Sequence, residues 1–257
     1  MKFVITTTQS VNNISDDMAR FINETGLLYV PRHKGSLNKI AADHNARGVV
    51  VWESEGPVLY IDNEKLFFHP SMAKCRIAAY RKQLQADIMV NACQLAPGDS
   101  FLDCTLGMGA DAIVAAYFSE SGKITGLESQ PVVAAVIGWG MKMYQGNMPW
   151  LNQAINRIEV IKSNHKDYLS QQADQSYDVV YFDPMFQRPL LKSQPISPLR
   201  KLANHDPLDM QTIHDACRVA KKCVVLKTLG GEEMVKFGFQ AVKGSKHNPI
   251  TYGIIRL

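Results

Sequence analysis

The chain has 257 residues, of which 46% are apolar and 20% are charged, so it can bury a core without a disulfide or metal staple. This composition excludes a disordered, collagen-like or coiled-coil protein, and no apolar run approaches the roughly 18 residues of a membrane helix. The net charge of +4 is too small to identify a polyanionic partner. Because the chain does not begin with a signal-peptide pattern, we expect a cytoplasmic protein without membrane contact.

The cysteines give no indication of a metal site. There are five of them, an odd number, and no two have the C-x-x-C spacing of a zinc cluster. We therefore expect neither a disulfide framework nor a bound metal, and we expect most of the thiols to be buried as small apolar groups.

Residues 1–70 alternate short strand and helix patterns. Strands are expected at 3–6, 27–30, 49–53, 58–61 and 65–68, and helices at 13–23 and 37–44. Ser36 is a suitable N-cap for the second helix, and Gly56-Pro57 and Asp62-Asn63 are expected to form turns. This pattern predicts a small N-terminal α/β subdomain that ends near Pro70.

Residues 71–257 predict a Rossmann-like, doubly wound fold with a seven-stranded, mostly parallel sheet. A long helix is expected from a cap at Ser71 to about Cys93. Strands then alternate with helical stretches, at 101–105, 123–127, 158–162, 179–182, 223–227, 239–242 and 251–255. The first, fourth and fifth of these are continuous apolar runs, as expected for parallel strands covered on both faces.

A glycine turn follows the first of these strands. The strand ends at Asp103 and Thr105, and Gly107 and Gly109 then lead into a helix whose free N–H groups can face a ligand. Glu128 closes the next strand, 19 residues after Gly109, where a carboxylate can accept both hydroxyls of a ribose. These residues predict a site for an adenosine-containing ligand, although a simple tight turn and a surface carboxylate would show the same pattern.

Asp103, at the end of the first strand, helps to decide between the two common adenosine-containing cofactors, NAD and S-adenosylmethionine. A dinucleotide places its pyrophosphate at the helix N-terminus, and the Asp103 carboxylate would repel it. A cofactor with an amine and a sulfonium needs such an acceptor. Asp103 therefore favours S-adenosylmethionine (SAM) over NAD.

The fourth strand runs directly into Asp183-Pro184-Met185-Phe186. A carboxylate and a backbone carbonyl at this position can accept the N–H groups of an exocyclic amine on a base and direct its lone pair at a methyl donor. Pro184 stiffens the turn, and Phe186 offers a face on which the base can stack. We expect Asp183, Pro184 and Phe186 to be catalytic, although Asp183 alone could be a helix cap before a proline turn.

With these motifs, residues 70–257 resemble the class I SAM-dependent methyltransferases. More narrowly, the chain resembles the bacterial small-subunit ribosomal RNA guanine-N2 methyltransferases of the J type. The resemblance is carried by segments 103–112, 127–135, 181–186 and 221–227 and by the helix start at 72–76. It implies methylation of a guanine amine in small-subunit ribosomal RNA.

The resemblance also implies which residues contact the cofactor, in addition to Asp103, Thr105 and the two glycines. These are Ala110, Asp111, Glu128, Ser129, Asn164, His165 and Asp183. Three positions depart from the family: Ala110 stands where Arg is frequent, Asn164-His165 replaces a small polar pair, and Gln187-Arg188 replaces Pro-His. The segments 5–10 and 31–37 are weakly similar to the start of Brix-type ribosome-biogenesis domains, which makes residues 1–70 a candidate for RNA contact.

The basic residues are unevenly distributed. Residues 184–257 hold 12 Lys and Arg against 5 Asp and Glu, a net charge of +7, whereas residues 1–183 carry −3. We expect RNA to be the partner, with a positive surface around the Asp183 loop, and Lys74, Arg76, Arg188 and Lys227 to contact it. Two alternatives stay open: a methyltransferase for adenine or a small molecule, and a non-catalytic RNA-binding assembly protein that keeps the fold.

Overall fold

A computed structural model describes residues 1–9, 11, 13–84, 87–184, 197–202, 206–229, 232–243 and 250–257. These residues form two compact units. The first contains residues 1–69 and 130–145 and helix α9 (Ser197–Leu202), and the second contains residues 70–129, 146–184 and the described part of 206–257. The two units are thus interleaved along the chain. The division into domains 1–70 and 71–257 stays a prediction.

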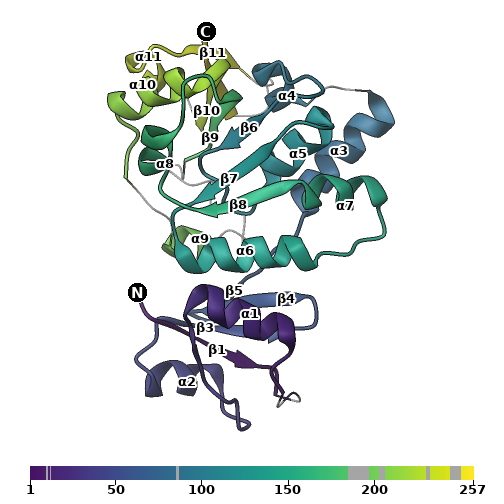
Figure 1. The fold of residues 1–257 in the computed structure, drawn as a ribbon, viewed down its shortest axis with the longest axis vertical. Coiled ribbons are helices and arrows are strands. Elements are labelled where there is room, and N and C mark those ends of the chain that lie inside the picture. Colours follow the sequence, from purple (N-terminus) through teal and green to yellow (C-terminus); the bar gives the residue numbers. More distant parts are fainter. Residues whose placement is uncertain are drawn as a thin grey trace. The chain divides into compact units, whose positions relative to one another are not determined.

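The first unit is built on a five-stranded sheet with the order β2-β1-β3-β4-β5 (Figure 1). Its strands are β1 (Phe3–Thr7), β2 (Leu28–Tyr29), β3 (Gly48–Glu53), β4 (Gly56–Ile61) and β5 (Glu64–Leu66). β1 is parallel to β2 and β3, whereas β3, β4 and β5 form antiparallel hairpins. Besides α9, its helices are α1 (Asp16–Thr25), α2 (Leu37–Asp43) and α6 (Pro131–Met143). Ser36 caps α2 as predicted, accepting a hydrogen bond from Lys39 N.

An aromatic cluster holds α6 in the first unit. The rings of Phe21, Trp52 and Trp139 lie 5.4–5.9 Å apart between centroids, at tilted or edge-to-face angles. Trp139 also donates its Nε1–H to Glu24 at 2.7 Å. Edge-to-face aromatic pairs stabilise beyond the area they bury, so α6 packs on α1 and β3 although it follows a strand of the second unit in sequence.

The second unit is built on a seven-stranded sheet, counted over the described residues, with the order β11-β12-β10-β9-β6-β7-β8 (Figure 1). Its strands are β6 (Phe101–Asp103), β7 (Ile124–Glu128), β8 (Ile158–Lys162), β9 (Tyr177–Phe182), β10 (Ala220–Leu229), β11 (Gln240–Lys243) and β12 (Ile250–Arg256). β12 is antiparallel to both of its neighbours, and the other pairs are parallel. The predicted Rossmann-like, mostly parallel sheet is confirmed.

Helices pack on the two faces of this sheet. They are α3 (Ser71–Gln83), α4 (Ile88–Cys93), α5 (Ala110–Ser119), α7 (Pro149–Asn156), α8 (His165–Gln171), α10 (Met210–Val219) and α11 (Glu232–Lys236). α5 lies on β6 and β7 with α3, α4 and α7 beside it, and α10 lies on β9 and β10 with α8 beside it. This coverage explains why β6 and β9 are almost entirely buried. None of the helices in the described residues combines the length and apolar character needed to cross a membrane.

Three local predictions are wrong. The helix expected from Ser71 to Cys93 is two helices, because Leu84 adopts a left-handed conformation (φ 53°) at the end of α3 and Asp87 then caps α4. The N-cap of α3 is Pro70, not Ser71. Gly56-Pro57 begins β4 and pairs with the end of β3, so the turn falls at residues 54–55.

Gly126 on β7 tests how tightly the glycine turn packs on the sheet. A Cβ at this position would lie 2.4 Å from Cδ1 of Leu106, the residue that directly precedes Gly107 in the glycine turn. We predict that Gly126→Ala lowers the free energy of unfolding by about 1–3 kcal/mol. The cost should largely disappear in a Leu106→Ala background, because that substitution removes the three atoms nearest to the added Cβ. Urea unfolding of the four proteins in this cycle measures the coupling, and strictly additive costs would contradict the packing described.

Candidate functional site

The carboxyl ends of β6 and β9 meet at one edge of the seven-stranded sheet. Asp103 ends β6 and pairs in register with Tyr181 of β9, and Asp183 follows the end of β9 directly. On the next strand, Lys227 comes immediately after the residue that pairs with Phe182. The parallel register therefore brings Asp103, Asp183 and Lys227 to the same edge, where ligands bind in open α/β sheets.

The glycine turn between β6 and α5 has the backbone conformation that its residues predict. Gly107 (φ 52°) and Gly109 (φ 75°) both lie in the left-handed region, and Gly109 is the N-cap of α5. The Leu106 N–H donates to Leu127 O on β7 at 2.8 Å, and the Gly109 N–H donates to Leu106 O at 2.7 Å. The turn is thus fixed to the neighbouring strand, and the first turn of α5 is directed at the sheet edge.

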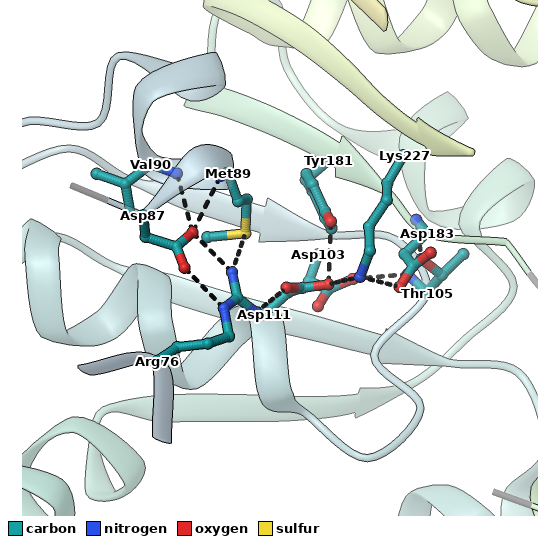
Figure 2. Close-up of polar contacts among 10 residues, drawn as sticks. All are labelled: Arg76, Asp87, Met89, Val90, Asp103, Thr105, Asp111, Tyr181, Asp183 and Lys227. Carbon is teal, nitrogen blue, oxygen red and sulfur yellow. Dashed lines mark hydrogen bonds and ion pairs between the residues drawn. The ribbon is translucent and has the colours of Figure 1, made fainter. Parts of the chain in front are cut away.

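Asp111, in the first turn of α5, is the centre of a buried polar network (Figure 2). Its side chain is only 8% exposed. Oδ2 accepts hydrogen bonds from the Tyr181 hydroxyl and from Lys227 Nζ, both at 2.9 Å. Oδ1 accepts a hydrogen bond from Arg76 Nη1. Charge-assisted contacts on both oxygens compensate the cost of burying this carboxylate.

Arg76 connects this network to α4. Its Nε and Nη2 donate to the two carboxylate oxygens of Asp87, each at 2.8 Å, while Nη1 contacts Asp111. The Asp87 carboxylate also caps α4 by accepting the N–H groups of Met89 and Val90. One guanidinium therefore joins α3 to the start of α4 and to the start of α5.

Asp183 lies at the other end of the network. Its N–H donates to Thr105 Oγ1 at 2.6 Å, which ties the backbone after β9 to the strand end after β6. Lys227 Nζ contacts its Oδ2 at 2.8 Å while also contacting Asp111. The side chain remains 27% exposed, so a ligand can still reach this carboxylate.

The paired groups of the network keep their charges. Burial disfavours the charge of Asp111, but Lys227 and Arg76 hold its pKa below the ordinary value. Burial opposes the charge of Lys227 as well, yet Asp111 and Asp183 raise its pKa above the ordinary value. Arg76 likewise has a raised pKa, because Asp111 and Asp87 outweigh the effect of burial.

The other two carboxyls are less well neutralised. Burial, reinforced by the charge of Asp111, raises the pKa of Asp103 to about 8. Burial also raises the pKa of Asp183 to about 6, with Lys227 opposing the rise. Both groups are therefore sensitive to a positive charge placed beside them.

These residues fit a cationic cofactor. Among the described residues, the network contains the carboxyls of Asp87, Asp103, Asp111 and Asp183 but only the cations of Arg76 and Lys227. SAM carries a sulfonium and an ammonium, and the excess of carboxyls can compensate them. The glycine turn leaves the backbone accessible beside Asp103. Asp103 ends β6, Gly107 and Gly109 form the turn that follows Thr105, and Ala110 and Asp111 lie in the first turn of α5. Their assignment to the cofactor stays a prediction.

Two further pairs of predicted cofactor residues follow β7 and β8. Glu128 is buried at the end of β7, with Ser129 directly after it. Asn164 caps α8 by accepting a hydrogen bond from Lys166 N at 2.9 Å. The His165 ring meets Phe182 edge-on at 5.7 Å, and its Nε2 is buried without a hydrogen-bond partner among the described residues. Burial lowers the pKa of His165, and a buried ring nitrogen without a partner can bond a polar ligand.

Three of the four basic residues expected to contact substrate are described, and these three do not form one group. Lys74 is exposed on α3, whereas Arg76 and Lys227 are committed to the buried carboxylates. Phe186 and Arg188 lie outside the described residues. The assignment of these residues to substrate stays a prediction.

Sequence reasoning missed Asp87 and Tyr181. Asp87 carries a local signal, because an Asp before an apolar helical stretch is an N-cap pattern. Its pairing with Arg76 has no such signal, and neither does the bond from the Tyr181 hydroxyl to Asp111, since both depend on tertiary packing.

Ion pairs neutralise part of the basic excess after Asp183. Lys201 contacts Asp62 and Glu64, Arg218 contacts Asp174, and Lys222 contacts Asp99. The predicted positive surface around the Asp183 loop stays a prediction, because much of that segment lies outside the described residues.

The raised pKa of Asp103 predicts a pH dependence of stability. Between about pH 4 and pH 8 the folded protein retains a proton on Asp103 that the unfolded chain releases, so stability falls as the pH rises. We predict that the wild type loses up to about 1.4 kcal/mol per pH unit relative to Asp103→Asn in this range. Urea unfolding at several pH values measures the difference, and parallel profiles for the two proteins would show that Asp103 is ionised throughout.

Comparison with known proteins agrees with this geometry. Residues 54–236 match the family model described as "Putative SAM-dependent methyltransferase". The chain is 34% identical to the uncharacterised protein YpiP of Bacillus subtilis over 91% of both chains. It is 33% identical to ribosomal RNA small subunit methyltransferase J of Acinetobacter baylyi over 108 residues, which are 41% of this chain and 39% of that one.

A solved structure shows the same fold. It is that of a SAM-dependent methyltransferase from Neisseria gonorrhoeae, which superposes with a TM-score of 0.62 at 18% identity and covers 98% of this chain and 95% of its own. The matched family model identifies SAM as the cofactor, and the carboxyl-rich edge of the sheet fits it. The chain belongs to the class I SAM-dependent methyltransferases and resembles those of the ribosomal RNA J type.

Proposed function

We propose that this methyltransferase modifies the exocyclic amine of a guanine in small-subunit ribosomal RNA. The observation that carries the proposal is the position of Asp183. Its backbone is fixed to Thr105, its Oδ2 is held by Lys227, and its side chain remains accessible at the sheet edge beside the glycine turn.

A fixed carboxylate is what a poorly nucleophilic amine requires. The lone pair of an exocyclic amine is delocalised into the base, and an acceptor on its N–H favours the geometry in which the lone pair is free to react. Asp183 supplies that acceptor and stabilises the positive charge that develops on nitrogen. Because Lys227 and Thr105 fix Asp183 beforehand, the carboxylate needs little reorganisation during the reaction.

The cofactor, when bound, supplies a methyl carbon whose bond to sulfur breaks as the amine nitrogen bonds to it, with the electron pair remaining on sulfur. Asp103, Glu128 and the turn at Gly107 are positioned to hold it, as their places at the strand ends suggest. Asp183, with a pKa raised to about 6, is largely ionised at neutral pH and can hold the N–H of the acceptor. The surplus proton of the methylated amine then leaves to water.

The choice of acceptor is supported by sequence similarity. Relatives from Acinetobacter baylyi and Thioalkalivibrio sulfidiphilus, 32–33% identical over 39–51% of their length, are named ribosomal RNA small subunit methyltransferase J. The Asp-Pro-Met-Phe segment suits a planar base with an amine. Guanine is favoured over adenine by this resemblance alone.

Replacement of the carboxylate tests its role in the reaction. We predict that Asp183→Asn lowers kcat by about 10²–10³-fold, a larger loss than its loss of SAM affinity, because the amide has lost the negative charge that stabilises the reacting amine. Transfer of a labelled methyl group to ribosomal RNA measures kcat, and calorimetry measures SAM binding. The matched control is Asp178→Asn, since Asp178 lies at the opposite end of β9 and bonds Ser100. Unchanged turnover in Asp183→Asn would remove this residue from the reaction.

Nucleoside analysis identifies the acceptor. We predict that ribosomal RNA from a strain lacking this gene has less N2-methylguanosine than the parent, and that the wild-type gene restores it whereas Asp183→Asn does not. Mass spectrometry of digested small-subunit RNA measures the content. Loss of a methyladenosine instead would transfer the proposal to adenine, and unchanged RNA would indicate another acceptor. If the Asp183→Asn gene restored the N2-methylguanosine content, the result would favour a non-catalytic role of this protein in ribosome assembly.

A further inference from the structure

We infer that Arg76 is a positioning residue for Asp183, acting through Asp111 and Lys227. The inference deepens the proposed function and rests on it, because it concerns the carboxylate assigned to the acceptor amine. The groups alternate in charge from one end to the other: Asp87, Arg76, Asp111, Lys227 and Asp183 (Figure 2).

Arg76 is poorly placed to bind RNA phosphate. Its side chain is 23% exposed, and all three of its nitrogens are engaged, with Nε and Nη2 on Asp87 and Nη1 on Asp111. Because all three nitrogens already donate to carboxylates, no pair of N–H groups is left for bidentate binding of a phosphate. Its charge acts inward, on the network.

The decisive feature is that two carboxylates share one ammonium. Lys227 Nζ lies 2.9 Å from Asp111 Oδ2 and 2.8 Å from Asp183 Oδ2. The strength with which Asp111 attracts Lys227 depends on how much of its charge Arg76 already neutralises. With Arg76 in place, Lys227 can hold Asp183. Without it, Asp111 would draw the ammonium toward itself and leave Asp183 poorly fixed and poorly neutralised.

Asp87 has the opposite effect on Arg76. It binds the guanidinium through both oxygens and so competes with Asp111 for its charge. Asn in place of Asp87 keeps an N-cap for α4 but removes the negative charge. Arg76 would then neutralise Asp111 more completely, and Lys227 would shift toward Asp183.

Titration of Asp183 also reflects its other neighbours. The described groups that face it or its partners are Asp103 on β6, Asp111 on α5, Tyr181 on β9, Lys227 on β10 and Tyr252 on β12. Of these groups, Asp111 contacts Arg76 directly, and Tyr252 interacts electrostatically with both Arg76 and Asp87. The place of Arg76 in the row of alternating charges therefore predicts whether each substitution raises or lowers the pKa of Asp183.

The test combines a direct readout of Asp183 with kinetics. In protein labelled with 13C at aspartate Cγ, the Asp183 signal is assigned by its loss in Asp183→Asn and then titrated with pH. Arg76→Met should raise the pKa of Asp183 by about one unit or more, Asp87→Asn should lower it, and Arg76→Lys should lie near the wild type. This readout needs no RNA, so it stands even if the acceptor is not ribosomal RNA.

Kinetics then separate positioning from general stability. Arg76→Met should lower kcat about tenfold or more with little change in KM for RNA, and Arg76→Lys should recover most of the loss. The matched control is Arg157→Met, because Arg157 also holds α5, but at its far end, through Ala116 O and Ser119 Oγ. The control should leave the pKa of Asp183 unchanged and kcat within about twofold of the wild type, a difference too small to reflect lost positioning.

Several results would overturn the inference. An Asp183 pKa that is the same in wild type and Arg76→Met would exclude positioning of Asp183 by Arg76. An equal loss of kcat in Arg157→Met would exclude it as well. If Arg76→Met does not fold, Asp87→Asn decides alone. Positioning through Asp111 and Lys227 requires Asp87→Asn to lower the pKa of Asp183, and an unchanged or raised pKa rejects the inference.

Discussion

The contact on which the site depends is the sharing of the Lys227 ammonium between Asp111 and Asp183. The buried ammonium forms an ion pair with each carboxylate. Its location therefore fixes the positions of both carboxylates. Asp111 belongs to the helix that follows the glycine turn and Asp183 to the strand end that carries the proposed acceptor loop. Lys227 therefore couples the part of the sheet assigned to the cofactor to the part assigned to the base. Breaking one arm of such a pair leaves a buried charge without a partner, which costs more than the pair contributes.

The sheet makes this arrangement possible through its order. β9 lies between β6 and β10, so the residues at their carboxyl ends are neighbours although more than 120 positions separate Asp103 from Lys227 in sequence. Parallel pairing also fixes the register: Asp103 opposes Tyr181, whose hydroxyl reaches Asp111. A slip of one residue would turn Tyr181 to the other face of the sheet. The same register that buries the apolar run of β9 thus also places the polar groups of the site.

The parts of the structure that could be predicted from sequence are those with local signals. The apolar runs of β6, β9 and β10, the glycines at 107 and 109 and the acids that follow strands are all readable in short windows, and the parallel sheet follows from their alternation. The partners of Arg76 and Lys227 could not be predicted, because a charge pattern does not reveal whether a cation faces solvent or a buried carboxylate. The break between α3 and α4 was missed for a related reason: Leu84 adopts a left-handed conformation that nothing in its side chain favours. The packing of α6 with the first unit depends on contacts of Trp139 with residues more than 80 positions away.

In the described part of the sheet edge, the excess of carboxyls over cations also explains which cofactor this edge accepts. In a dinucleotide site the helix N-terminus after the glycine turn faces a pyrophosphate, and acids nearby would repel it. In this protein Asp103 and Asp111 lie beside that helix start, and burial keeps Asp103 from ionising fully by itself. A cationic ligand reverses this penalty, since its charge favours the ionised carboxylate and the carboxylate in turn favours the ligand. Selectivity for SAM over nucleotides with phosphates then follows from electrostatics of buried groups, without a contact to the adenine that both kinds of cofactor share.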